Sequence, residues 1–134
     1  MENPLPRSKT VAVTVASEQE PVTVDGELLQ SDDGFVLKFS VSNDQFTVTH
    51  GSVFTRITAV GDMTYDIELT DGVTSTVLAT PFGKVKFAVK TVVRDVTVGD
   101  DRIRISLKYI LDGASVGEIE RTVDISVRFF NSES

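Results

Sequence analysis

The sequence predicts an all-β domain, an antiparallel meander of about eight to ten strands closed into a barrel. Apolar and polar residues alternate along nearly the whole chain, and turn sequences such as Asp71-Gly72 and Asp112-Gly113 separate the alternating runs. No segment has the apolar spacing of an amphipathic helix over more than about two turns. Because a meander must protect its edge strands, we expect a barrel, with a two-layer sandwich as the alternative.

The predicted strands in the first half of the chain follow from this alternation. Valine occupies every second position from Val11 to Val15, and Phe35, Leu37 and Phe39 share one face of a later run. Turn sequences containing proline, glycine, asparagine or aspartate lie between the runs. The predicted strands are residues 10–15, 22–30, 35–41, 46–49 and 53–60.

In the second half, strands are predicted at residues 63–69, 73–80, 85–93, 102–111 and 119–129. In the run at 85–93, strict alternation places Val93 on the inward face and Arg94 on the outward face. Ile119 belongs to the predicted buried set of the last strand, together with Val123, Ile125, Val127 and Phe129. Keeping both apolar faces inward puts Leu111 near Ser115 on the neighbouring strand, so either the loop between the two strands is three residues long or a bulge lies near Gly117, and both alternatives stay open.

The length of the chain, 134 residues, is typical of one domain. We expect the barrel to occupy residues 8–130, with a flexible arm at residues 1–7 and a short tail at residues 131–134. The absence of cysteine excludes thiolate catalysis, thiolate metal sites and disulfides. No apolar run has the length of a signal-peptide core or a membrane span, so we expect a cytoplasmic protein without a membrane partner.

The sequence contains no motif of an enzyme. Serine-type nucleophilic catalysis needs a histidine base, and the single histidine, His50, lies in a predicted turn, where we expect it to be exposed. Asp32-Asp33 and Asp100-Asp101 lie beside glycines in predicted turns and lack the spacing of a calcium loop. No phosphate-binding loop sequence occurs. We therefore expect no catalytic activity, no cofactor and no metal site.

The distribution of charge argues against a nucleic-acid partner. The formal net charge is −7, whereas phosphate binding depends on clustered lysine and arginine. A basic stripe on one strand, formed by Lys84, Lys86, Lys90 and Arg94, has its aromatic neighbours on the opposite face. This stripe is interpreted as a solvated strand face.

Arg121 is the most informative irregularity, because alternation places it on the inward face with Ile119 and Val123. A guanidinium inside a barrel needs a partner. It can bind the carboxylate of a ligand in a cavity, pair with Asp95, or be turned outward by a bulge near Gly117. Tyr109, on the inward face of the preceding strand, is the second candidate ligand-binding residue.

Thr80-Pro81-Phe82-Gly83 suits a type I turn, and Phe82 is expected to cap one end of the barrel. The same motif is the centre of a resemblance to a known family. The stretch from Met63 to Val127, with TPFG ahead of two long alternating strands, resembles the YwiB-like family of small uncharacterised bacterial proteins. The resemblance implies a lipocalin-like, calycin-type β-barrel. It implies no function and no site residues.

The leading hypothesis is a non-enzymatic cytoplasmic barrel that binds a small, partly apolar molecule, with Arg121 and Tyr109 as the polar ligand-binding residues. The hypothesis depends on analogy between folds. The alternative is a protein-protein interaction module that uses an edge strand or the acidic N-terminal half. No feature of the sequence names a ligand or indicates an oligomeric state.

Overall fold

The computed structural model describes residues 9–17, 20–61, 64–113 and 117–130. The arm at 1–7 and the tail at 131–134 lie outside these residues. The described ranges contain ten strands and no helix, which confirms the all-β prediction. In order, the strands are β1 (Lys9–Ala16), β2 (Val22–Ser31), β3 (Gly34–Val41), β4 (Asp44–His50), β5 (Thr55–Val60), β6 (Tyr65–Leu69), β7 (Val73–Thr80), β8 (Gly83–Val98), β9 (Arg102–Gly113) and β10 (Gly117–Phe129). Within the described ranges there is accordingly no helix with the length and apolarity to cross a membrane.

The strands form one antiparallel sheet in the order β6-β5-β4-β3-β2-β1-β10-β9-β8-β7. The two end strands meet at a seam, where Thr64 and Ala79 exchange two backbone hydrogen bonds of 3.1 and 2.9 Å. The Thr74 and Thr76 hydroxyls donate to the carbonyl oxygens of Glu68 and Asp66, at 2.6 Å each. The sheet is therefore a nearly closed barrel, as predicted. Two threonine hydroxyls of β7 donate to backbone carbonyl oxygens of β6 that would otherwise be unpaired at the edge of the sheet.

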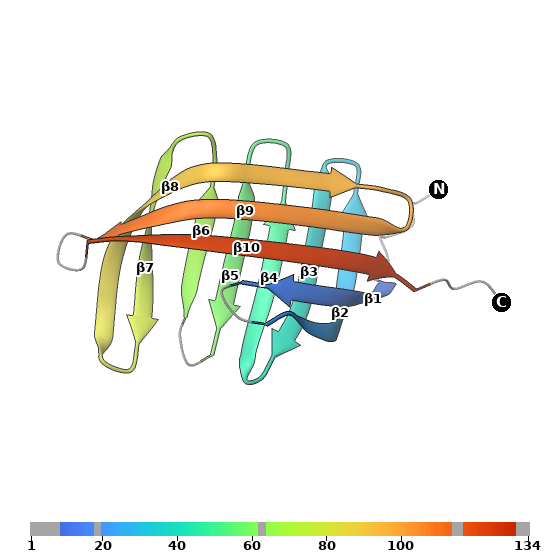
Figure 1. Cartoon of the computed structure of the whole chain (residues 1–134), viewed down its shortest axis with the longest axis horizontal. Helices are drawn as coiled ribbons and strands as arrows, with labels where there is room; N and C mark the ends of the chain where they lie inside the picture. Colours follow the sequence, from blue (N-terminus) through green and yellow to red (C-terminus); the bar gives the residue numbers. More distant parts are fainter. Residues whose placement is uncertain (1–8, 18–19, 62–63, 114–116, 131–134) are drawn as a thin grey trace, which may run out of the picture.

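The barrel consists of two crossed layers, with β9, β10 and β1 running across the direction of β3 to β7 (Figure 1). Two strands belong to both layers. Residues 22–25 of β2 pair with β1 alone, residues 26–28 pair with both β1 and β3, and residues 29–31 pair with β3 alone. In the same way, β8 pairs with β7 up to Lys90 and with β9 from Ala88 onward. Strands that pass from one layer to the other form the corners of an orthogonal barrel.

Each corner has a local reason in the sequence. At the β2 corner, Gly26 lies so close to its neighbours that a Cβ atom would be 2.8 Å from the Lys38 carbonyl oxygen and 2.8 Å from Val13 Cγ2. Only glycine allows strands to approach this closely. At the β8 corner, the pairing with β9 shifts by one residue between Thr91 and Val93. Such a bulge bends a strand and changes which side chains face inward.

The bulge makes the predicted phase of the second half of β8 wrong. Val93 is 40% exposed, and Arg94 lies opposite the buried Leu107, on the inward face. Asp95 is exposed on the outward face. Alternation is a reliable guide only while the strand keeps its register, and one inserted residue exchanges the two faces.

The core consists of apolar side chains from both layers. Its largest fully buried members are Leu28, Leu37, Leu69, Ile103, Ile105, Leu107, Ile125, Val11, Val13, Val48, Val89 and Val127. The prediction that Ile119 is buried is wrong, because its side chain, although on the inward phase of β10, is 38% exposed near the start of the strand. Leu111 pairs with Ile119, so the predicted neighbour of Leu111 is wrong. Gly113 pairs with Gly117, so the β9–β10 connection is three residues long, and the alternative of a bulge near Gly117 is wrong.

Candidate functional site

A cavity of about 750 Å³ opens at one end of the barrel. This is within the range of about 300–1,000 Å³ that small-molecule sites occupy. Its wall is mostly apolar, from side chains of both layers: Val15, Val22, Phe39, Val41, Phe46, Val48, Ile57, Val123 and Ile125. Ser17, Glu20, Asp44, Tyr65, Tyr109, Glu120 and Arg121 add polar groups. The cavity thus combines an apolar interior with a small number of hydrogen-bonding groups.

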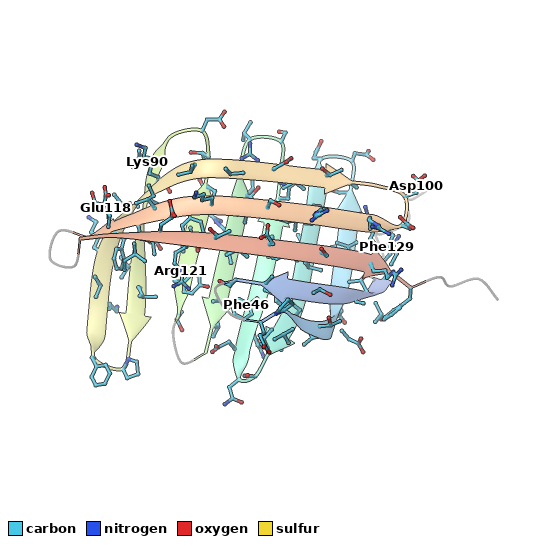
Figure 2. The ribbon with its side chains drawn as sticks, viewed as in Figure 1. Phe46, Lys90, Asp100, Glu118, Arg121 and Phe129 are labelled. Carbon is cyan, nitrogen blue, oxygen red and sulfur yellow. The ribbon has the colours of Figure 1, made fainter. Side chains whose placement is uncertain are left out.

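The two predicted site residues, Arg121 and Tyr109, both line this cavity. They lie directly opposite each other on β10 and β9, and Thr91 lies opposite Tyr109 on β8, so the three residues form a polar row across three strands. Tyr109 is buried, whereas Arg121 is exposed because it lies where the barrel opens. Figure 2 shows Arg121 of β10 and Phe46 of β4 at this end of the barrel.

Two of the alternatives for Arg121 are wrong. The β9–β10 register runs without a shift from Gly117 to Arg128, so no bulge turns Arg121 outward. The internal pair with Asp95 fails because the β8 bulge places Asp95 on the outward face. Arg121 therefore faces the cavity from the inward phase of β10.

Tyr65 is a cavity residue that the sequence did not single out. Burial raises the pKa of its hydroxyl, the Arg121 charge lowers that pKa, and Asp44 raises it. The effect of Arg121 on this pKa is larger than that of Asp44. Tyr65 belongs to the predicted strand at residues 63–69, but β6 and β10 are not neighbours in the sheet, and no sequence pattern indicated that Tyr65 and Arg121 line the same cavity.

A second polar group lies inside the barrel, around Thr55 at the start of β5. Thr55 is 0% exposed, and its Oγ1 lies 2.9 Å from His50 Nδ1 and 3.4 Å from Arg94 Nη1. The prediction of an exposed His50 is wrong, since the histidine is partly buried and its ring centroid lies 5.2 Å from that of Phe35. The sequence missed this group because it placed Arg94 on the outward face.

Two hydrogen bonds through the Thr55 hydroxyl connect Arg94 and His50. The Arg94 guanidinium can only donate, so it donates to Thr55 Oγ1, whereas the direction of the bond between Thr55 Oγ1 and His50 Nδ1 depends on the histidine tautomer. Burial lowers the pKa of His50, and the Arg94 charge lowers it further.

The free energy of unfolding should therefore decrease as the pH falls below the ordinary histidine pKa of 6.5. A lowered native pKa means that the unfolded chain binds the proton more readily, so this stabilisation is complete above 6.5 and is lost as the pH falls through the native pKa. The measurement is urea unfolding of the wild type and of His50→Asn, from about pH 7.5 to about pH 5. The wild type should lose more stability than the variant, and parallel curves would contradict a lowered pKa of His50.

The β7–β8 hairpin carries the TPFG motif outside the barrel. Thr80 pairs with Gly83, which has a φ of 132°, so Pro81 and Phe82 form a two-residue connection. Phe82 is 98% exposed, and the prediction that it caps one end of the barrel is wrong. Lys84, Lys86 and Lys90 are exposed, as expected for a solvated strand face, whereas Arg94 lies inside.

The fold and the cavity together define a β-barrel of two crossed layers with one open, mostly apolar mouth. Among solved structures, the ywiB protein from Bacillus subtilis is similar, with a TM-score of 0.71, 14% sequence identity, and 91% of each chain covered. This likeness supports the resemblance seen in the sequence at the level of the fold alone. No family model matches the chain, and neither does any curated protein.

Proposed function

We propose that the protein is a non-enzymatic binder of a small, partly apolar molecule that carries one carboxylate. The observation that supports the proposal is the open cavity, whose apolar wall ends at Arg121, Tyr109 and Tyr65. Burial of the apolar part of a ligand supplies most of the affinity in such a site, and a few polar groups at the mouth determine its orientation.

Arg121 is the one basic residue among the described residues of the cavity wall, and it favours a single carboxylate as the head group. Arg121 has the donor geometry that suits a carboxylate. Of the acidic residues, Glu120 forms an ion pair of 3.6 Å with Lys108, and the effect of Asp44 at the Tyr65 hydroxyl is smaller than that of Arg121. A neutral Tyr65 phenol can donate to the same head group. The remaining acidic residues of the mouth disfavour a ligand with several negative charges.

Calorimetry with sodium octanoate as the probe, and with octanamide as its neutral counterpart, tests this proposal. We expect one octanoate per chain and weaker binding of octanamide. Arg121→Met should weaken octanoate binding by about 10- to 100-fold, since a hydrogen bond to a charged group contributes about 1.5–3 kcal/mol.

The matched control is Arg128→Met, which removes an exposed outward arginine from the same strand. It should leave octanoate binding unchanged. Equal binding of octanoate by the wild type and Arg121→Met, or no binding by the wild type, would refute the proposal. Native mass spectrometry of gently purified protein adds a check on a ligand carried from the cell.

The proposal extends to the identity of the chain as a YwiB-like, lipocalin-like protein of the cytoplasm. The similar fold of the ywiB protein supports the YwiB-like identity, together with the TPFG motif ahead of two long strands. The absence of cysteine is compatible with the reducing cytoplasm and supports that location. The absence of a catalytic motif in the sequence supports a binding role over an enzymatic one.

A further inference from the structure

The guanidinium of Arg94 is a positive charge inside the barrel without a carboxylate beside it. Within the described part of the chain, no ion pair of Arg94 occurs within 4.0 Å, and its hydrogen bond goes to the neutral hydroxyl of Thr55. A partly buried cation that lacks a counter-charge is costly. The bulge in β8 is the feature that brings Arg94 to this position, because a regular strand would place it in solvent.

Two buried polar atoms beside the bulge also lack a partner among the described residues. They are Arg94 Nε and Thr91 Oγ1. Thr91 and Arg94 lie opposite Tyr109 and Leu107, which are successive inward residues of β9, so the two side chains are neighbours on the inner wall. Both groups can donate a hydrogen bond. Each buried donor without a partner lowers the stability of the folded protein by about 1–3 kcal/mol. An anionic acceptor that bonded to both donors would remove both losses and would also neutralise the charge of Arg94.

We infer that the inner wall at the β8 bulge is a binding site for a small carboxylate, held by Arg94 Nε and Thr91 Oγ1. A carboxylate has two acceptor oxygens for the two donors, and its single charge balances one guanidinium. Thr55 holds the other side of the guanidinium through Nη1 and leaves Nε available. Arg94 is not part of the wall of the open cavity, so this site is separate from the one around Arg121.

The carboxylate has two possible sources, a free small acid or the head group of a longer molecule. Sodium formate represents the first and sodium octanoate the second. Nuclear magnetic resonance of arginine side chains reports the site directly, because the Nε–H resonance of Arg94 shifts when that group donates to an anion. The resonance is assigned by its loss in Arg94→Lys, and a bulky sulfonate holds the ionic strength constant.

In the wild type, formate should shift the Arg94 Nε–H resonance with saturation at one site. Thr91→Val preserves the shape of that side chain and the Arg94 reporter, and it should raise the formate dissociation constant about 10-fold. A saturating shift of the Arg94 Nε–H resonance with octanoate, but not with formate, also supports the site and assigns it to the head group of a longer ligand. No saturating shift with either probe would overturn the inference and leave a neutral solvent molecule as the partner of these donors.

Arg121→Met separates this inference from the proposed function. That variant should lose octanoate binding at the mouth and keep the full formate response at Arg94. Conversely, Thr91→Val should keep octanoate binding by calorimetry if the two sites are independent. If Arg121→Met abolished the response at Arg94, the anion would occupy the mouth, and the inference would be wrong. Arg128→Met again serves as the control for the loss of one positive charge.

Discussion

Gly26→Val should lower the free energy of unfolding by about 3 kcal/mol, because the added side chain overpacks a position that is closed on both sides. At this position a Cβ atom would contact the Lys38 carbonyl oxygen and Val13 Cγ2 at 2.8 Å, and Phe39 Cβ at 3.2 Å. Gly26 pairs with both Val11 and Phe39, so β1 and β3 hold the backbone on both sides and neither can move without breaking its own pairing.

Urea unfolding of the wild type, Gly26→Ala and Gly26→Val measures this effect. Alanine adds only the Cβ atom and should lose about 1–2 kcal/mol, with valine losing more. Gly72→Ala is the control, because its surroundings leave room for a Cβ, the nearest neighbour being Thr70 Oγ1 at 3.9 Å. If Gly26→Val were as stable as the wild type, β2 would not pass between the layers at this corner.

Leu107→Ala should lower the free energy of unfolding by about 3–4 kcal/mol, since truncation of a fully buried leucine loses the buried apolar surface and leaves a void. Leu107 is 1% exposed and lies at the centre of the crossing layer, with Arg94 on one side and Val123 on the other. Its surroundings belong to long paired strands, which limits their collapse into the void.

The same urea measurement on Val73→Ala provides a matched control from an exposed position in β7. That change should stay within about 0.5 kcal/mol of the wild type, as surface truncations usually do. A loss of less than about 1 kcal/mol for Leu107→Ala would contradict a closely packed centre of this layer.

The strands could be predicted from the sequence because each one buries a single face, which imposes a period of two on its residues. The runs at 35–41 and 73–80 agree closely with β3 (Gly34–Val41) and β7 (Val73–Thr80). The alternation could not predict the bulge at β8, because an inserted valine is as compatible with a strand as any other residue. That one residue exchanged the faces of Val93, Arg94 and Asp95.

The candidate site was predictable in part for the same reason. Arg121 and Tyr109 stood out as polar residues on inward faces, and the strands that carry them are neighbours. Tyr65 and Asp44 reach the same mouth from the other layer, and their proximity depends on how the layers cross. The group formed by His50, Thr55 and Arg94 depends both on that crossing and on the bulge.

The central claim is that the open end of the barrel accepts an apolar molecule with its carboxylate at Arg121. The most direct test is a methyl-resonance titration of the wild type with sodium octanoate. We expect saturating shifts at methyl groups of the cavity wall, such as Val15, Val48 and Ile57, with unchanged methyl resonances at the exposed Val73 and Val77 of β7. Shifts confined to the exposed valines, or no saturating shift at the wall, would contradict the claim.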